Sequence, residues 1–353
     1  MGPRRGWYRA AAMADSLVSA LNRVVEGQDL DTATARSVMD GMMEGVATPA
    51  QVGAFLAALR LKGETVDELT GMVESMRHHA VPVALTAPAV DTCGTGGDRS
   101  GTFNISTAAA LVVAGSGCPV AKHGNRAQSS RCGSGDVLEA LGVAIALPPA
   151  GVVRCIQEAG IGFMLAPVYH PAMRHVGPVR QELGIRTAFN IMGPLANPAR
   201  VRHQLIGTPS DGLARKMAGV LARLGHRRAV VFSGPDGTDE LLLHAPAHAY
   251  LVEEGSITEI DIDPARLGVS AAPLSALAGG DAAANAERMR SLLAGERGPV
   301  RDCVILNAGA ALFAAEHALT IEGGMVAAER AIDSGAARDR LDALVRVSSE
   351  AAS

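Results

Sequence analysis

Aromatic side chains and basic charge are both scarce in this chain. Phe, Trp and Tyr together make up 3% of the 353 residues, and the formal net charge at pH 7 is −4. A protein that binds nucleic acid needs a basic face for the phosphates and aromatic rings for the bases. The composition therefore argues against a nucleic-acid partner, whereas 48% hydrophobic and 19% charged residues are typical of a soluble globular protein with a large core.

Long apolar runs and paired cysteine motifs are also missing. No run approaches the roughly 20 apolar residues of a membrane span, so no membrane partner is expected. The five cysteines are odd in number and show no Cys-x-x-Cys spacing, which predicts free thiols in a reducing compartment, the cytoplasm. Residues 1–12 contain arginines but no apolar core, so they are expected to form a disordered tail and not a secretory signal.

The chain has a glycine-rich loop, but it lacks the two commonest sequence motifs of phosphate-binding loops. Glycines stand at 94, 96, 97 and 101, between the apolar pair Ala89-Val90 and the apolar run 108–114. A dinucleotide fingerprint starting at Gly94 needs a third glycine where Arg99 stands. A Walker A loop needs a lysine where Thr102 stands. Both motifs are therefore excluded.

A strand, a glycine loop and a helix still predict an anion site at residues 90–114. Glycine lets backbone N–H groups approach a ligand closely, and a helix N-terminus, capped here by Asn104 or Ser106, attracts phosphate. The alternative is a glycine-rich turn without a ligand. Asp98 and the hydroxyl groups of Thr102, Ser106 and Thr107 favour a magnesium–phosphate complex, because magnesium prefers oxygen ligands.

The organisation of the chain changes near residue 82. Apolar residues at helical spacing predict four helices, at 16–26, 32–44, 48–62 and 65–79, with Thr48 and Thr65 as caps. We therefore expect a helical domain at 13–81, a two-proline hinge at 82–88 and an α/β domain with a mostly parallel sheet at 89–353.

In the second part, strands and helices are predicted to alternate, with antiparallel strands between 241 and 262. The predicted strands are near 90, 119–122, 143–147, 162–166, 204–208 and 229–233. The predicted helices are near 106–115, 135–141, 150–159, 211–224, 283–293, 301–317 and 321–347.

A second motif runs from Lys122 to Gly142. Lys122 and Arg126 follow a predicted strand, and Gly133-Ser-Gly-Asp136 starts a predicted helix. Ligand sites of open α/β sheets gather at the carboxyl ends of strands, so this segment is expected to hold a second part of a polyphosphate. The alternative is a solvated basic loop.

A third motif gathers basic residues between Tyr169 and Pro198. His170, Arg174, His175, Arg180 and Arg186 surround a predicted helix, and Gly193-Pro-Leu195 is predicted to form a tight turn. Arginines in this setting are suited to clamp a carboxylate. The two histidines are five residues apart, not the four of a helical zinc pair, so a zinc site is not expected.

A fourth motif is Ser233-Gly-Pro-Asp-Gly-Thr-Asp-Glu240. On a strand, Asp239 and Glu240 would point to opposite faces, but in a turn built by Gly234, Pro235 and Gly237 they can converge. They are then a candidate magnesium pair. A solvated acidic turn is the alternative.

Together, the four motifs resemble the anthranilate phosphoribosyltransferase family of tryptophan biosynthesis over nearly the whole chain, about 14–337. The resemblance rests on Gly94-Thr-Gly-Gly-Asp98, Asn104-Ile-Ser-Thr107, Lys122-His-Gly-Asn125, Gly133-Ser134, Asp136-Val-Leu-Glu-Ala-Leu-Gly142, His170-Pro-Ala-Met173, Arg180-Gln-Glu-Leu-Gly-Ile-Arg-Thr187, Gly193-Pro-Leu195 and Asp239-Glu240. It implies a homodimer that binds phosphoribosyl pyrophosphate and magnesium in the cleft between the two domains. It also implies that about 168–190 joins the helical domain.

The resemblance assigns roles to individual residues. Phosphoribosyl pyrophosphate would be held by Gly94, Gly97, Asp98, Thr102, Asn104, Ile105, Ser106, Thr107, Lys122, His123, Gly124, Asn125, Arg126 and Ser134. Anthranilate would be held by Gly94, Asn125, His170, Arg180, Gly193 and Pro194. Two magnesium ions would be bound by Ser106, Asp239 and Glu240. Asn125 and His170 are candidates to accept the proton of the amine, and the resemblance implies no covalent nucleophile.

The chain departs from the usual pattern at Cys132, Gly135 and Ala127-Gln128, none of which is an assigned ligand. Three alternatives remain at this point. A pyrimidine nucleoside phosphorylase shares the implied architecture but has no need of Asp239 and Glu240. A phosphoribosyltransferase for another aromatic acceptor would differ in a few residues of the acceptor site. A nucleotide-binding regulator would bind the ligands without turnover.

Overall fold

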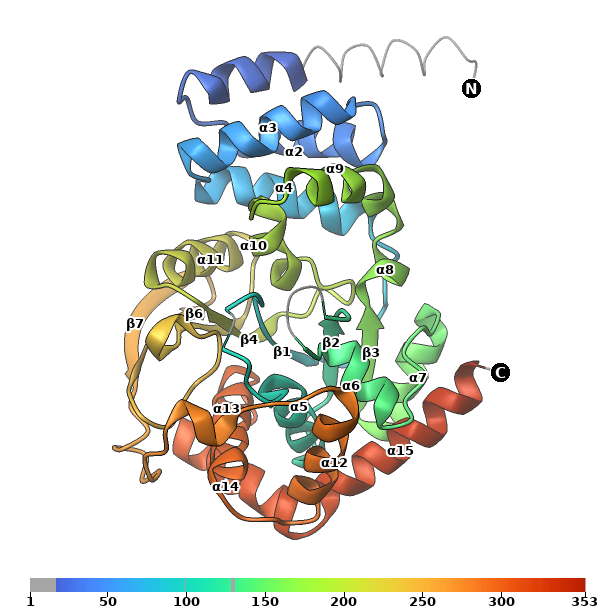
Figure 1. The fold of residues 1–353 in the computed structure, drawn as a ribbon, viewed down its shortest axis with the longest axis vertical. Helices are drawn as coiled ribbons and strands as arrows, with labels where there is room; N and C mark the ends of the chain where they lie inside the picture. The colour runs from blue at the N-terminus through green and yellow to red at the C-terminus, as the bar shows by residue number, and fades with distance from the viewer. Residues whose placement is uncertain (1–16, 99, 128–130, 353) are drawn as a thin grey trace. The chain divides into compact units, whose positions relative to one another are not determined.

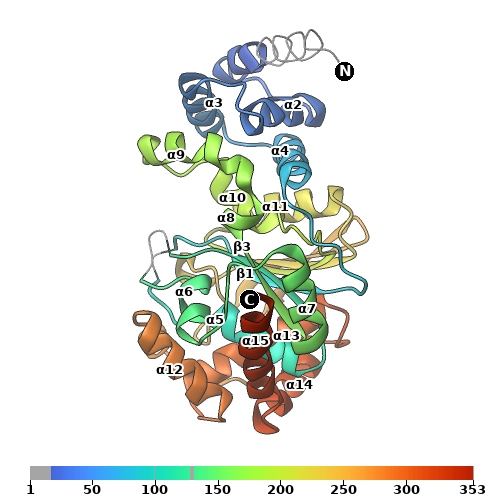
Figure 2. The ribbon, with the colours of Figure 1, turned by 90° about the vertical axis from the view of Figure 1, so that its right-hand side faces the viewer.

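The computed structural model describes residues 17–98, 100–127 and 131–352. The chain divides into two compact units, each described here by itself (Figures 1 and 2). One unit comprises the chain up to Pro82 together with Tyr169–Pro198, and the other comprises Val83–Val168 and Ala199–Ser353. The tail expected at residues 1–12 and the variant residue Gln128 lie outside the described residues.

The first unit is helical, as expected. It contains a helix over residues 17–25, α2 (Thr32–Met43), α3 (Pro49–Lys62) and α4 (Val66–His79), and later η1 (Pro171–His175), α9 (Gly177–Leu183) and α10 (Ala188–Leu195). The predicted caps are confirmed: Thr48 and Thr65 each form a capping box, with Gln51 and Glu68. Within this unit α9 and α10 pack against α3, and α10 also packs against α4.

A turn predicted at Gly193-Pro-Leu195 is wrong. These residues form the end of α10, with Pro194 inside the helix. α10 ends at Leu195, one residue after Pro194, and the N–H of Ala196 closes the last turn on the carbonyl of Gly193 at 3.2 Å. The neighbouring Leu195 carbonyl accepts a hydrogen bond from Nε of Arg77 at 2.7 Å, which ties α10 to α4.

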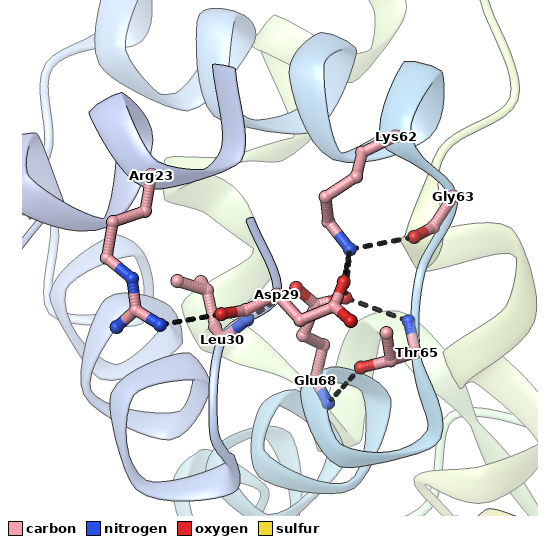
Figure 3. A network of polar contacts seen from close by, with 7 residues as sticks. All are labelled: Arg23, Asp29, Leu30, Lys62, Gly63, Thr65 and Glu68. Carbon is pink, nitrogen blue, oxygen red and sulfur yellow. Dashed lines mark hydrogen bonds and ion pairs between the residues drawn. The ribbon is translucent and has the colours of Figure 1, made fainter. Parts of the chain in front are cut away.

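A buried ion pair between Lys62 and Glu68 lies at the N-terminal end of α4 (Figure 3). Glu68 is fully buried; its carboxylate accepts hydrogen bonds from the N–H groups of Leu30 and Thr65, at 3.0 and 2.8 Å. Lys62 donates to the same carboxylate at 3.0 Å and to Asp29 at 2.6 Å. One carboxylate therefore joins the loop before α2 to the loop between α3 and α4.

The second unit is built on a seven-stranded sheet, mostly parallel as predicted. Its strands are β1 (Val90–Gly94), β2 (Val120–Gly124), β3 (Ile161–Leu165), β4 (His203–Thr208), β5 (Arg228–Ser233), β6 (Ala247–Glu253) and β7 (Ser256–Ile262), in the order β3-β2-β1-β4-β5-β6-β7. The first five strands are parallel, and β6 and β7 form the predicted antiparallel edge.

Helices cover both faces of this sheet (Figures 1 and 2). The helices of the unit are α5 (Ile105–Gly115), α6 (Ser134–Ala140), α7 (Pro149–Ala159), α8 (Ala166–Tyr169, whose last residue belongs to the helical unit), α11 (Asp211–Arg223), α12 (Ala282–Leu293), α13 (Pro299–Ala314), α14 (Ile321–Asp333) and α15 (Ala336–Ala352). Right-handed crossovers place α5 and α7 on one face and α11 on the other, because the strand order runs in opposite directions from β1. α13 packs against α5.

Two predictions for this unit are wrong. Residues 143–147 form no strand, although alternate side chains in this segment are buried. The N–H of Ala144 donates to the side chain of Ser348 in α15 at 3.0 Å, so its hydrogen-bond acceptor comes from a helix and not from a neighbouring strand. The helix predicted at 321–347 is two helices, because Gly335 adopts a φ of 82° after α14 ends.

The strand order reverses direction between β1 and β4, which are neighbours in the sheet. In open α/β sheets such a switch point creates the crevice for ligands at the carboxyl ends of the strands. The glycine-rich loop follows β1, Lys122–Gly124 ends β2 and the acidic pair follows β5.

None of the helices in the described part of the chain is long and apolar enough to cross a membrane.

The buried carboxylate of Glu68 generates a stability prediction. Glu68→Ala should lower the free energy of unfolding by about 3 kcal/mol, because it leaves two backbone N–H donors without their acceptor and removes the buried one of the two carboxylates that pair with Lys62. Urea denaturation measures the change. Glu74→Ala, on the same helix but in a partly exposed pair with Arg36, should cost about 0.5 kcal/mol. Equal losses in the two variants would contradict the role given to Glu68.

Candidate functional site

The N-terminus of α5 lies directly after the glycine-rich loop. Gly96, Gly97 and Gly101 have φ values of 74°, 73° and 66°, which only glycine adopts freely. The predicted capping by Asn104 or Ser106 is wrong in detail: within the described residues, the Asn104 side chain occupies the N-cap position without bonding to the helix. The N–H of Ser106 donates instead to the Glu240 carboxylate, at 3.2 Å.

The acidic motif thus meets the glycine loop. One carboxylate oxygen of Asp239 accepts the N–H of Gly96 at 2.6 Å, and the N–H of Asp239 lies 3.5 Å from a carboxylate oxygen of Asp98. Asp239 and Glu240 are only 8% and 9% exposed. The solvated acidic turn is therefore excluded, and carboxylates from two distant motifs lie together.

This crowding perturbs the titration of both groups. Burial, followed by the negative charge of Asp98, raises the pKa of Asp239 to about 7. Burial, followed by the charge of Asp239, raises the pKa of Glu240 well above its usual value, although Lys122 acts in the opposite direction. The protein alone therefore does not neutralise the cluster.

Two glycines make the close approach possible. A Cβ at Gly94 would overlap with the Asp239 carboxylate, and a Cβ at Gly207 would overlap with the Asp239 carbonyl oxygen. The two residues are opposite each other in the register of β1 and β4. Each strand at the switch point thus has a glycine in its last two residues, because the acidic segment crosses directly over them.

Lys122 is a buried cation of the site. Its side chain is 1% exposed, and Nζ donates to the carbonyl of Thr92 on the neighbouring strand at 2.5 Å. This burial excludes the solvated loop for Lys122. Arg126 differs, because it is exposed and its guanidinium forms a bidentate ion pair with Glu139, at 2.5 and 2.9 Å.

The second glycine motif is brought beside the end of β2. Gly133 is the N-cap of α6, and the Asp136 carboxylate accepts the N–H groups of Gly133 and Ala127, each at 2.8 Å. The carbonyl of Asn125 accepts the N–H of Gly135 at 3.0 Å. A Cβ on Gly124 would lie 3.3 Å from Cβ of Ser134. The β2 end and the α6 start are therefore one structural piece.

The remaining predicted residues of this unit lie at the end of β2 and around the start of α5. His123 is buried and its N–H donates to Asp91 at 3.3 Å. Thr102 Oγ1 lies 3.1 Å from Ser100 Oγ, and the N–H of Ile105 is bonded to the Phe103 carbonyl at 2.7 Å. Among the described residues the buried hydroxyl of Thr107 has no hydrogen-bond partner. A ligand oxygen would satisfy it.

The donor set fits a magnesium ion. Asp239, Glu240 and the Ser106 hydroxyl offer hard oxygen ligands, and a divalent cation would offset the buried negative charge of the carboxylates. No group of three His, Cys, Asp or Glu side chains in the described ranges is arranged to hold a metal by itself. Magnesium usually keeps waters and binds through one or two carboxylates plus phosphate oxygens.

Four predicted site residues, His170, Arg180, Gly193 and Pro194, belong to the helical unit. His170 is 6% exposed, and burial lowers its pKa to about 4. Burial also lowers the pKa of Arg180, whose guanidinium lies over the Phe189 ring at 4.9 Å. The unit therefore carries a neutral imidazole and a partly desolvated guanidinium, and Gly193 and Pro194 lie in α10.

Sequence reasoning missed Asn307, which supports the acidic pair from α13. Its side chain accepts the N–H of Leu241 at 3.2 Å and donates to the Leu241 carbonyl at 2.9 Å, so it holds the residue after Glu240 on both sides. Asn307 is 1% exposed in a helix whose other buried residues, apart from Arg301, are apolar. A polar residue in such a helix was the available signal, because a buried amide needs partners.

The raised pKa of Asp239 generates a pH prediction. The folded protein holds this proton below about pH 7, whereas the unfolded chain releases it near 3.8, so ionisation destabilises the metal-free protein as pH rises through this window. Asp239→Asn should raise the unfolding free energy at pH 8 in EDTA by about 2 kcal/mol, a gain that fades toward pH 4.

Thermal unfolding in EDTA between pH 8 and pH 4 measures this difference. Asp236→Asn is the control, since Asp236 is exposed and pairs with His244 at 2.8 Å. A destabilised Asp239→Asn protein at pH 8 would show that Asp239 is not under electrostatic strain.

Comparison with known proteins places these features in a family. A glycosyl transferase family α/β-domain model matches residues 86–338, and the helical bundle domain model of that family matches residues 18–80. An anthranilate phosphoribosyltransferase of Thermomicrobium roseum is 53% identical over 92% of this chain and 95% of its own length. One of Moorella thermoacetica is 52% identical, over 93% and 97%.

Solved structures agree with these sequence matches. The crystal structure of the Thermus thermophilus anthranilate phosphoribosyltransferase matches with a TM-score of 0.88 and 43% identity, covering 94% of this chain and 99% of that one. The Saccharomyces cerevisiae enzyme in complex with PRPP and Mg matches with a TM-score of 0.86 and 26% identity, covering 95% and 98%. The chain therefore belongs to the anthranilate phosphoribosyltransferase family.

Proposed function

We propose that this protein transfers the phosphoribosyl group of phosphoribosyl pyrophosphate to the amine of anthranilate, releasing pyrophosphate, in tryptophan biosynthesis. The observation that carries this proposal is the contact of the buried pair Asp239 and Glu240 with the glycine loop and the start of α5. Amide donors for phosphate and carboxylates for magnesium are then side by side. The close anthranilate phosphoribosyltransferase relatives support the choice of substrates.

The phosphate-binding role belongs to the α/β unit. Gly94, Gly97, the α5 start and the hydroxyl groups of Thr102 and Thr107 bind the pyrophosphate oxygens, and Lys122 adds a buried positive charge. The β2 end and Ser134 bind the ribose phosphate. Ser106, Asp239 and Glu240 hold magnesium at two sites, and its charge stabilises the departing pyrophosphate.

The reaction breaks the bond between ribose C1 and the pyrophosphate oxygen and forms a bond from C1 to the amine nitrogen. An aromatic amine is neutral at pH 7, so no strong base is needed to activate it. The protein acts by positioning the two substrates and by stabilising the charge that leaves. The amine loses one proton, which passes to water.

The helical unit supplies the anthranilate contacts in this proposal. Arg180 binds the substrate carboxylate, and a desolvated guanidinium does so more strongly than a solvated one. His170 is neutral at pH 7, because burial lowers its pKa to about 4. It therefore orients the amine and does not take up the proton.

Two further parts of the proposal concern the protein as a whole. The five cysteines are free thiols, which suits the reducing cytoplasm. A homodimer, as the family resemblance implies, is also part of the proposal, and Val18, Val25 and Leu61 are exposed apolar side chains of the helical unit.

The test of the proposed function is the loss of anthranilate fluorescence over time. The signal should fall only when the protein, phosphoribosyl pyrophosphate and magnesium are all present. Phosphorolysis of pyrimidine nucleosides by the same protein, without loss of anthranilate, would favour the nucleoside phosphorylase alternative. Turnover of a different aromatic amine would overturn the choice of acceptor alone.

The assignment of Arg180 generates a kinetic prediction. Arg180→Ala should raise the KM for anthranilate by about 10- to 100-fold, the value of a lost charged hydrogen bond, and leave the KM for phosphoribosyl pyrophosphate within about twofold. Steady-state kinetics measures both constants. Arg174→Ala is the control, because Arg174 is exposed and contacts His175. An equal rise in both KM values would contradict the assignment.

A further inference from the structure

Asn285 is a buried amide in the first turn of α12 that none of the functional motifs includes. It is 2% exposed. Its carbonyl oxygen accepts the N–H of Gly280 at 2.7 Å, and its amide nitrogen donates to the side-chain oxygen of Asn104 at 2.9 Å. The amide nitrogen of Asn104 in turn donates to the carbonyl of Cys132 at 3.2 Å.

These three hydrogen bonds form a relay with a fixed direction. The relay begins at a backbone N–H, which can only donate, and ends at a backbone carbonyl, which can only accept. Both side-chain amides must therefore point the same way along it. Reversing either amide would bring two donors or two acceptors face to face.

The relay joins the segment before α12 to two pieces of the proposed phosphate-binding region. Gly280 precedes α12, Asn104 is the N-cap residue of α5 and Cys132 precedes Gly133, the N-cap of α6. It also engages the Asn104 side chain elsewhere than at the α5 N-terminus. An asparagine at this position ordinarily accepts an N–H of its own helix. Here the N–H of Ser106 donates to Glu240 instead, and the Asn104 side chain serves the relay.

The segment before Asn285 braces the same loop through its backbone. The N–H of Phe103 donates to the Leu277 carbonyl and the N–H of Gly279 to the Gly101 carbonyl, both at 2.8 Å. Thr102 and Ala278 form an isolated antiparallel bridge. Gly101–Asn104 is thus held along its length by residues 277–285.

We infer that Asn285 is a positioning residue for phosphoribosyl pyrophosphate, acting through Asn104 to hold the start of α5 in register with the start of α6. This inference rests on the proposed function. Asn285 itself does not contact the substrate in this account.

The direct test replaces the donor without changing the shape. Asn285→Asp keeps the acceptor for Gly280 but turns an oxygen toward the oxygen of Asn104. We expect the Kd for phosphoribosyl pyrophosphate by calorimetry, and its KM, to rise about tenfold. The KM for anthranilate should stay within about twofold. Asn285→Ala should likewise weaken the binding of phosphoribosyl pyrophosphate and leave the KM for anthranilate nearly unchanged. It replaces Asn285→Asp if that variant does not fold.

A double-mutant cycle with Asn104→Ala separates positioning from general stability. If Asn285 acts through Asn104, adding Asn285→Ala to Asn104→Ala should not weaken binding further. Thr320→Ala is the matched control, because it removes a cap of α14 and lowers stability without touching the relay. Its Kd for phosphoribosyl pyrophosphate should stay at the wild-type value.

Additive effects in the cycle, or an equal loss in Thr320→Ala, would overturn the inference while the proposed function stands. An unchanged Kd in the folded Asn285 variants would do the same. A wild-type protein that fails to bind phosphoribosyl pyrophosphate would overturn both.

Discussion

The α/β unit depends on one electrostatic constraint: two buried carboxylates lie against a helix N-terminus and a glycine-rich loop. Such a cluster is unfavourable on its own, and the raised pKa values of Asp239 and Glu240 report this. The N–H groups of Gly96 and Ser106 offset part of the charge. The protein thus carries a negative site beside donors for a negative ligand. Only a cation bound together with phosphate satisfies both.

The rest of the unit places this cluster. Gly94 and Gly207 leave no Cβ under the acidic segment, so it can cross the switch point of the sheet. Asn307 holds the backbone of Leu241 from α13, and the Asn285–Asn104–Cys132 relay joins the loops that start α5 and α6. Buried amides therefore fix both sides of the site. Such amides hold the site firmly, because a buried amide that loses its hydrogen-bond partners pays a large desolvation penalty.

The sequence predicted those features whose causes are local. Thr48 and Thr65 cap helices through residues three positions away, and the strand and helix periods identified the sheet and most of its helices. Prediction from the sequence failed where a partner far away in the chain determines the local structure. No strand forms at 143–147, where the N–H of Ala144 donates to Ser348, 204 residues away. The N–H of Ser106, which was expected to bond to a local cap, donates to Glu240, 134 residues away. The resemblance assigned Asp98 to phosphoribosyl pyrophosphate and Asp239 to magnesium, but no sequence pattern predicted that the two carboxylates lie together. Asn307 and Asn285 were missed because Leu241 and Asn104, which they contact, are 66 and 181 residues away.

The central claim is that the buried carboxylates couple the binding of magnesium and phosphoribosyl pyrophosphate. Calorimetric titration of the substrate into wild-type protein, in EDTA and in saturating magnesium, tests it most directly. The account predicts a Kd that falls by tenfold or more with magnesium, on the order of the 1–3 kcal/mol typical of linked sites, and no such fall in the Asp239→Asn, Glu240→Gln protein. Equal affinity of the wild-type protein in EDTA and in magnesium would contradict the account.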